Sequence, residues 1–125
     1  MKKNNISDRR TSVLVVDDET MAVKSLTRIL SADGYNVNAT TKGKRALELV
    51  STKKFGVVLT DLLIDMISGM DVLAAAKENA PDTEVIILTG HGSVDSAIQA
   101  TKQGAFHYLQ KPIRPDEVRN IVKRA

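Results

Sequence analysis

The sequence predicts an α/β domain in which helices cover both faces of a five-stranded parallel sheet. Five short aliphatic runs alternate along the chain with longer segments whose apolar residues recur at helical spacing. The runs are apolar at consecutive positions, which is typical of parallel strands that are buried on both faces. A length of 125 residues is enough for one such domain with a single core. This regular alternation indicates a doubly wound α/β fold.

The five expected strands are rich in β-branched and aliphatic residues. The second is the least apolar, because Val37 and Ala39 alternate with asparagines. In chain order the strands are expected at residues 13–16, 35–39, 55–60, 84–88 and 105–110.

Start and stop signals for helices lie between these strands. Asp33-Gly34 is expected to end the first helix, because glycine readily adopts the left-handed conformation past a helix C-terminus. Pro81 and Gly104 are expected to end the third and fourth helices. Ser93 suits an N-cap, and Pro115 suits the first turn of the last helix. The expected helices cover residues 19–32, 42–52, the segment between 69 and 81, 93–103 and 115–125.

The formal net charge of +3 lies in the N-terminal segment. Residues 1–10 hold four basic side chains and one acidic one, whereas the other 115 residues hold 14 of each sign. We expect residues 1–11 to form a disordered basic tail and residues 12–125 to form the domain. Because the domain itself is electrically balanced, direct binding of nucleic acid is not expected. The last helix stops with its apolar pattern unfinished, so we expect the chain to be part of a longer protein.

Several kinds of protein are excluded by what the sequence lacks. It has no cysteine, which excludes a disulfide framework and thiolate metal sites. No apolar run approaches the roughly 20 residues that span a bilayer, and the N-terminus has no apolar core of a secretory signal. We therefore expect a cytoplasmic protein that does not enter membranes.

Polar side chains follow four of the five expected strands. Asp17 and Asp18 follow the first strand, Asp61 the third, Thr89 the fourth and Lys111 the fifth. In open α/β sheets, ligands bind outside the carboxyl ends of the strands. Three carboxylates at that edge repel one another unless a cation lies between them, and an all-oxygen set suits Mg²⁺. A lysine and a threonine opposite the cation suit a phosphoryl group, so the set predicts Mg²⁺-dependent phosphoryl chemistry.

Each of these residues also has an ordinary structural interpretation. An Asp-Asp pair after a strand is, taken alone, more often a helix N-cap followed by a solvated acid. A single Asp, Thr or Lys-Pro after a strand is usually part of a loop. Their joint occurrence at one edge of one sheet favours a functional site.

Taken together, these residues make the chain resemble the receiver domain of bacterial two-component response regulators, of the kind found in chemotaxis regulators. The resemblance covers about residues 11–125 and implies a flavodoxin-like (βα)5 fold with a phospho-accepting function. The residues that carry it are Val13 to Glu19, Thr60-Asp61-Leu62, Gly69, Leu88-Thr89-Gly90, and Gly104-Ala105 through Tyr108 to Lys111-Pro112.

The resemblance implies a role for each residue of the site. Asp61 would take a phosphoryl group from a sensor histidine kinase and become 4-aspartylphosphate. Asp18, Asp61 and the backbone carbonyl of Leu63 would bind Mg²⁺ directly, and Asp17 would bind it mainly through water. Lys111 would pair with the phosphoryl oxygens.

The resemblance also implies a conformational switch. Thr89 would donate its hydroxyl to the phosphoryl group, and Gly90 would leave room for that group. Tyr108 would rotate inward into the space beyond Thr89 and remodel the surface of the fourth helix, fifth strand and fifth helix. The Lys111-Pro112 bond would be cis.

The loop after Asp61 departs from the family at one place, and two positions near the site vary within the family. Where the family often has Met-Pro, this chain has Ile64-Asp65, which adds a carboxylate and removes a rigid turn. Leu63 and His91 occupy positions that modulate the dephosphorylation rate in the family. We expect Leu63 to shield the acyl phosphate from water.

The segment from Thr89 to Ala105 is most similar to receivers of transcriptional activators that carry an AAA+ ATPase and a DNA-binding output domain. A receiver from a hybrid kinase is the alternative. A phosphorylation-dependent homodimer would form through the face of the fourth and fifth helices. The chain would catalyse only its own phosphorylation and dephosphorylation and would not be a turnover enzyme.

Two rival functions stay open on the sequence alone. A phosphatase of the haloacid-dehalogenase type would need a second acid where Leu63 stands. A pseudo-receiver that signals only by protein contacts usually lacks an acid or the lysine, and this chain has all of them.

Overall fold

The computed structural model describes residues 12–64, 66–90 and 94–125. The expected tail at residues 1–11 and the expected N-cap Ser93 lie outside these ranges. The strands are β1 (Ser12–Val16), β2 (Asn36–Thr40), β3 (Val57–Asp61), β4 (Leu63–Ile64), β5 (Ile67–Ser68), β6 (Glu84–Thr89) and β7 (His107–Gln110). The helices are α2 (Thr20–Ala32), α3 (Gly43–Thr52), α4 (Gly69–Asn79), α5 (Val94–Lys102) and α6 (Pro115–Arg124).

Five strands form one parallel sheet in the order β2-β1-β3-β6-β7. The chain steps outward from β1 to β2 and then returns to the other side of β1 to form β3. The strand order therefore reverses at β1 and β3, and in such sheets the crevice at this reversal is where ligands bind. The predicted fold class is confirmed.

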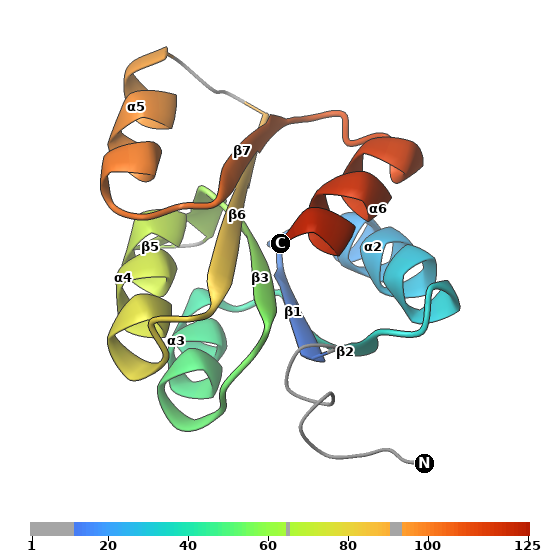
Figure 1. The fold of residues 1–125 in the computed structure, drawn as a ribbon, viewed down its shortest axis with the longest axis horizontal. Coiled ribbons are helices and arrows are strands. Elements are labelled where there is room, and N and C mark those ends of the chain that lie inside the picture. The colour runs from blue at the N-terminus through green and yellow to red at the C-terminus, as the bar shows by residue number, and fades with distance from the viewer. Residues whose placement is uncertain (1–11, 65, 91–93) are drawn as a thin grey trace.

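Helices cover both faces of this sheet, as Figure 1 shows with the sheet nearly edge-on. Helices α2 and α6 lie on one side, and α3, α4 and α5 lie on the other. Val13 and Val15 of β1 belong to the core under α2 and α6, whereas Leu14 and Val16 belong to the core under α3 and α4. All four side chains are fully buried, and each contributes roughly 1.5–3 kcal/mol by leaving water. Burial on both faces explains why the strands are apolar at consecutive positions.

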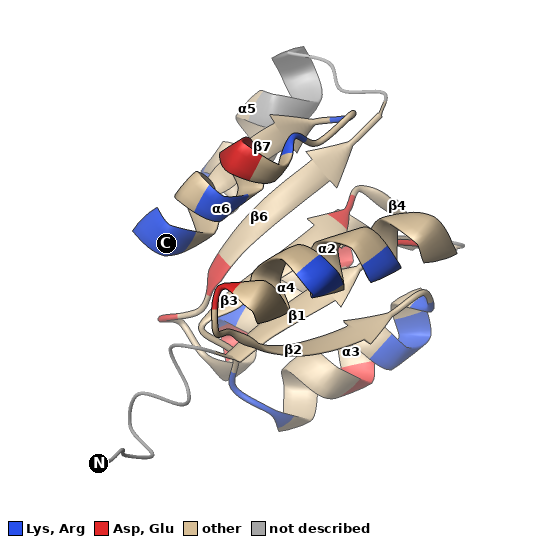
Figure 2. Cartoon of the chain, turned by 90° about the vertical axis from the view of Figure 1, so that its right-hand side faces the viewer, with Lys and Arg blue, Asp and Glu red and all other residues tan. Residues whose placement is uncertain are grey.

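Charged residues lie mainly on the outer faces of the helices. Figure 2 shows basic and acidic positions together on α3 and on α6. Among the described residues, no helix has the length and apolar character that a bilayer crossing requires.

The predicted strands and helices are all present, with shifted ends. The third strand begins at Val57 rather than at residue 55. Phe55 is buried in the core but lies before the strand, so its apolar character was misread as part of it. The fifth strand begins at His107, two residues later than predicted. Gly34 and Gly104 have φ of 95° and 100°, as the predicted stop signals require. The antiparallel hairpin β4–β5 was not predicted, because two-residue strands carry no periodic pattern.

A buried threonine in the loop between α4 and β6 is hydrogen-bonded to the segment just before β3. The Thr83 side chain is 2% exposed, and its hydroxyl donates to the Phe55 carbonyl over 2.7 Å. We expect Thr83→Val to lower the free energy of unfolding by about 1–3 kcal/mol, because it leaves a buried carbonyl without its donor. Urea unfolding measures this change.

A matched control is Thr52→Val. The Thr52 hydroxyl also donates to a backbone carbonyl, that of Glu48, but it is exposed to water. This substitution should change stability by no more than about 0.5 kcal/mol. Equal losses in the two variants would contradict the role assigned to Thr83.

Candidate functional site

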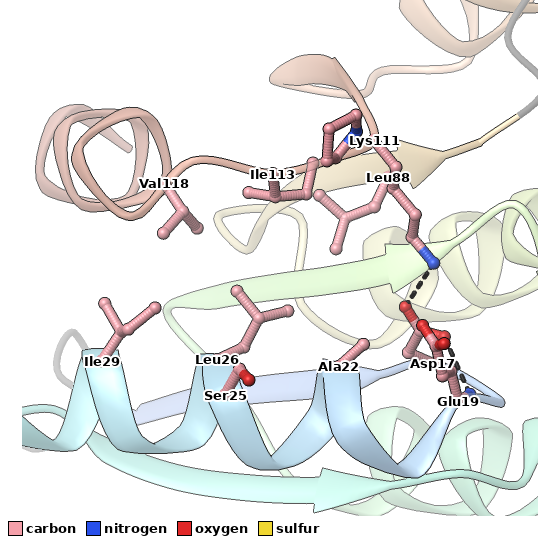
Figure 3. A pocket seen from close by; sticks show the side chains of 11 residues that line it. Asp17, Glu19, Ala22, Ser25, Leu26, Ile29, Leu88, Lys111, Ile113 and Val118 are labelled. Atoms are coloured by element: carbon pink, nitrogen blue, oxygen red, sulfur yellow. Dashed lines mark hydrogen bonds and ion pairs between the residues drawn. The ribbon is translucent and has the colours of Figure 1, made fainter.

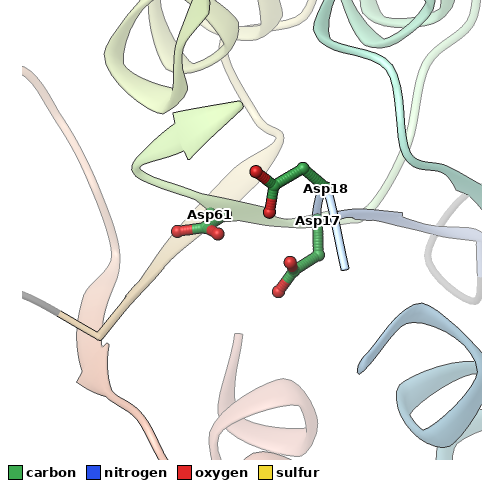
Figure 4. A group of neighbouring side chains, drawn as sticks. All are labelled: Asp17, Asp18 and Asp61. Carbon is green, nitrogen blue, oxygen red and sulfur yellow. The ribbon is translucent and has the colours of Figure 1, made fainter. Parts of the chain in front are cut away.

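Three carboxylates meet at the carboxyl end of the sheet. The parallel pairing of β1 with β3 places Asp17 and Asp18 beside Asp61. One oxygen from each residue lies within 4.8 Å of the other two (Figure 4). Asp17 is fully buried and Asp61 is 8% exposed, whereas Asp18 is open to solvent. The structure thus brings together the three predicted carboxylates.

Lys111 joins this cluster from the fifth strand of the sheet. Its Nζ donates to Asp17 Oδ2 at 2.6 Å and to Asp61 Oδ2 at 3.2 Å. Its backbone N–H donates to the carbonyl of Thr89 at 2.7 Å, which ties the lysine to the end of β6. The Lys111-Pro112 bond is cis, as predicted.

Burial and neighbouring charges act in opposite directions on the two central groups. Burial raises the pKa of Asp61, and the Asp17 charge raises it further. The ammonium of Lys111 and the backbone N–H of Leu63 lower that pKa only in part. Burial lowers the pKa of Lys111, but its ion pairs with Asp17 and Asp61 outweigh this effect and the pKa is raised. Lys111 therefore stays charged, while the ionised form of Asp61 is disfavoured.

The charge and the donor atoms of the cluster fit a divalent cation. Three carboxylates and one ammonium leave two negative charges uncompensated within a few ångströms. All the side-chain donors are oxygens, and Asp18 keeps one side of the cluster open to water. Mg²⁺ prefers this combination of carboxylates and retained waters.

Gly69 and a short hairpin hold the loop that follows Asp61. The backbone N–H of Gly69 donates to the Leu62 carbonyl at 2.7 Å. A Cβ at Gly69 would collide with the backbone carbonyl of Asp61, so only glycine fits there. The Leu63 side chain, which starts the hairpin, is 63% exposed. Asp65 lies outside the described residues.

The other predicted residues surround the cluster. Thr89 is 3% exposed at the end of β6 and directly follows Leu88, which pairs with Asp61 across the β3–β6 ladder. A Cβ at Gly90 would meet no atom within 4 Å, so the space beside it is open. Tyr108 packs against the core under α3 and α4, and its buried hydroxyl has no hydrogen-bond partner among the residues that the structure describes. His91 lies outside the described residues.

A pocket of about 520 Å³ opens between α2 and α6 next to the cluster (Figure 3). Asp17 and Lys111 lie at one end of it, joined by their hydrogen bond. Its walls are mostly apolar and include Leu26, Ile29 and Val118. Lys111 therefore lies between an acidic cluster and an apolar pocket, with 24% of its side chain exposed.

The structure shows a helix-start contact of Asp17, related to the N-cap interpretation considered for the Asp-Asp pair, and a helix cap that sequence reasoning missed. Asp17 Oδ1 accepts from the backbone N–H of Glu19 at 2.9 Å, so Asp17 also anchors the start of α2. Ser68 and Asp71 form a capping box at the start of α4, the helix that follows the hairpin. The Ser-x-x-Asp spacing was a readable signal for this cap.

Comparison with known proteins agrees with this geometry. The sequence matches the response regulator receiver domain over residues 13–123. The transcriptional regulatory protein GlrR of Escherichia coli K12 is 34% identical over 120 residues, which cover 96% of this chain and 27% of GlrR. The chain thus spans about a quarter of the length of the curated relatives it matches.

Two solved receiver structures are similar throughout the fold. The beryllofluoride-activated receiver domain dimer of NtrC4 superposes with a TM-score of 0.85 at 36% identity, over 91% of this chain and 94% of that one. A response regulator from Burkholderia pseudomallei with a phosphorylated aspartic acid, a calcium ion and citrate gives a TM-score of 0.83 at 32% identity. That match covers 89% of this chain and 65% of the other. The chain belongs to the response regulator receiver domain family.

Proposed function

We propose that Asp61 is the phospho-acceptor of this receiver domain and that Lys111 is its principal cationic partner. The observation that carries the proposal is the pair of contacts from one ammonium to both Asp17 and Asp61. The phosphorylated aspartic acid in the Burkholderia pseudomallei relative supports the same chemistry.

Phosphoryl transfer requires an in-line nucleophile and charge neutralisation more than covalent help from the protein. A carboxylate oxygen of Asp61 attacks phosphorus, the bond from phosphorus to the donor's histidine nitrogen breaks, and an acyl phosphate forms. Asp18, Asp61 and the Leu63 carbonyl would hold Mg²⁺, with Asp17 acting through water, and the ion supplies positive charge at the phosphoryl oxygens. Lys111 exchanges its contact with Asp61 for a contact with those oxygens. Water would then hydrolyse the acyl phosphate, releasing inorganic phosphate and restoring the Asp61 carboxylate. This step would complete the domain's own cycle.

The switch follows from the new, nearly dianionic group. Thr89 would donate its hydroxyl to that group, and Gly90 leaves the space beside it open. Tyr108 would fill the volume beyond Thr89, and its buried hydroxyl, which has no partner in the described ranges, would gain a hydrogen bond if a rearrangement there supplied one. Phosphorylation then shifts the population between two packings of α5, β7 and α6.

The relatives suggest what this surface controls. GlrR is named a transcriptional regulatory protein, and this chain corresponds to 27% of its length. We infer that a sensor histidine kinase donates the phosphoryl group and that an AAA+ ATPase with a DNA-binding domain is the output. The activated NtrC4 receiver is a dimer, which supports a phosphorylation-dependent homodimer here as well. We place this pathway in the cytoplasm.

The direct test is incubation with Mg²⁺ and acetyl phosphate. We expect wild type to gain the mass of one phosphoryl group, in a bond that base cleaves, because the product is an acyl phosphate. Mass spectrometry measures the adduct. Absence of the adduct in wild type, or an undiminished adduct in Asp61→Asn, would overturn the proposal.

The raised pKa of Asp61 predicts a pH-dependent stability. A carboxyl group whose pKa is raised by folding stabilises the fold below its ordinary value of 3.8, and this contribution is lost as pH rises through the folded value. Without divalent cations, Asp61→Asn should therefore be more stable than wild type at pH 7. The advantage should shrink toward pH 4, as measured by urea unfolding at both pH values.

Added Mg²⁺ provides the control for this effect. It should raise the unfolding midpoint of wild type more than that of Asp61→Asn, since the variant lacks one ligand charge. An Asp61→Asn variant that is less stable than wild type at pH 7 without Mg²⁺ would show that burial does not disfavour the ionised carboxylate.

Leu63 is proposed to slow hydrolysis of the acyl phosphate. Its side chain projects from the first residue of the hairpin and excludes water from the phosphoryl group without offering a hydrogen bond. We expect Leu63→Asn to lose phosphate severalfold faster, because the amide can orient a water molecule. Phosphate release after removal of acetyl phosphate measures the rate.

The matched control is Met66→Asn, which places the same amide on the same hairpin. Met66 is 98% exposed and lies between the two hairpin strands, β4 and β5. Its rate of phosphate loss should equal that of wild type. Equal rates in Leu63→Asn and wild type would remove Leu63 from control of the lifetime.

A further inference from the structure

The first residue of α3 packs directly against the hairpin that follows the acceptor. Gly43 is buried at the start of this helix, 18 positions before Asp61 in the sequence. A Cβ built on Gly43 would lie 2.8 Å from the Cβ of Ile67 and 3.2 Å from the carbonyl oxygen of Ile64. Separations below 3.0 Å are essentially never seen for real Cβ atoms. The Ile67 side chain and the Ile64 carbonyl therefore pack against the backbone of Gly43 and leave no room for a side chain there.

The backbone conformation does not explain this glycine. Gly43 is not among the glycines with positive φ, which are Gly34 and Gly104. Alanine would fit the local conformation and would favour the helix relative to glycine. What the position requires is space, and that space is occupied by Ile67. Because a Cβ is fixed to the main chain, rotation of the Ile67 side chain cannot relieve the contact.

The hairpin connects this contact to the acceptor site. Ile64 pairs with Ile67, and Leu63 pairs with Ser68, in a ladder only two residues long. Ile64 is fully buried, and the N–H of Leu63 bonds to the Asp61 carboxylate. At the other end of the hairpin, Gly69 packs on the Asp61 carbonyl. A shift of Ile64 and Ile67 therefore has a short, buried path to the backbone of Leu63.

We propose that Gly43 is a positioning residue for the metal site of the receiver. Its missing side chain lets the hairpin lie where the Leu63 carbonyl can reach the ion held by Asp18 and Asp61. The inference rests on the proposed function of this cluster. Mg²⁺ demands nearly ideal octahedral geometry at 2.0–2.1 Å, so a displacement of a few tenths of an ångström at one ligand is costly.

The test is the Mg²⁺ affinity of Gly43→Ala, measured by calorimetry without any phosphoryl donor. We expect the Kd to rise about 10- to 100-fold, the range found when residues that support metal ligands are replaced. Lys44→Ala is the matched control, because Lys44 is exposed in the same first turn and also becomes alanine. Its Kd should stay within about twofold of wild type, since no metal ligand moves.

Phosphorylation kinetics separate positioning from general damage. With acetyl phosphate, Gly43→Ala should need more Mg²⁺ for half-maximal rate but should approach the wild-type rate at saturating Mg²⁺, because Asp61 and Lys111 are intact. A rate that stays low at every Mg²⁺ concentration would contradict positioning of the metal site. A wild-type Kd for Gly43→Ala would also overturn the inference.

A second substitution tests the route through the hairpin. Ile67→Gly removes the two Ile67 atoms that a Cβ at position 43 would meet, at 2.8 and 3.3 Å. In the Ile67→Gly background, Gly43→Ala should change the Mg²⁺ Kd by less than about twofold. A full effect in that background would contradict the route.

If Gly43→Ala alone fails to fold, the double variant with Ile67→Gly still tests the inference. Circular dichroism should then show that the double variant folds, with the Mg²⁺ affinity of Ile67→Gly alone. A double variant that is also unfolded would contradict action through Ile67. If wild type itself does not bind Mg²⁺, the proposed function fails, whereas normal binding by a folded Gly43→Ala overturns only the inference on Gly43.

Discussion

The excess of negative charge at the ends of β1 and β3 is the constraint on which the rest of this structure depends. Asp17 is fully buried and Asp61 nearly so, and each would be unfavourable there without a cation. Lys111 supplies one positive charge, at 2.6 Å from Asp17 and 3.2 Å from Asp61. The shorter distance and the burial of Asp17 make Asp17 the firmer partner. Of the two buried carboxylates, Asp61 is therefore the one that Lys111 holds less firmly, which agrees with its proposed role as the phospho-acceptor.

The parallel sheet imposes this arrangement. Val16 pairs with Thr60, so the residues that follow them leave the sheet side by side. The neighbouring strand β6 delivers Thr89, whose carbonyl holds the backbone of Lys111. The side chains of Asp17, Asp61, Thr89 and Lys111 thus all come from the carboxyl ends of strands of one sheet. The sheet therefore sets the distances between the charged groups, whereas the loop after Asp61 is not part of this sheet.

The difference between rigid strand ends and an adjustable loop decides what the sequence could predict. Asp17, Asp61 and Lys111 were predicted to meet because parallel strands place their carboxyl ends at one edge, whatever the details of packing. The hairpin β4–β5 was not predictable, since its two-residue strands show no alternation of polar and apolar residues. Gly43 was not predictable either. In sequence, a glycine that starts a helix looks the same whether its missing side chain faces water or Ile67, which is 24 residues away.

The geometry also explains how one phosphoryl group can act on a surface beyond the site. Lys111 is fixed to Thr89 by its backbone and to two carboxylates by its ammonium, so its contacts are shared between β6, β1 and β3. In the proposed function, a dianionic group on Asp61 would compete for the ammonium and for the Thr89 hydroxyl at the same time. Tyr108 lies on the strand next to β6, opposite Ile87, and its buried hydroxyl has no partner within the described part of the chain. A buried hydroxyl without a hydrogen bond costs free energy, so a packing that gives it a partner would be favoured. Tyr108 therefore lies next to the residues whose contacts the proposed phosphorylation of Asp61 would change, which is the arrangement that a switch between two packings would need.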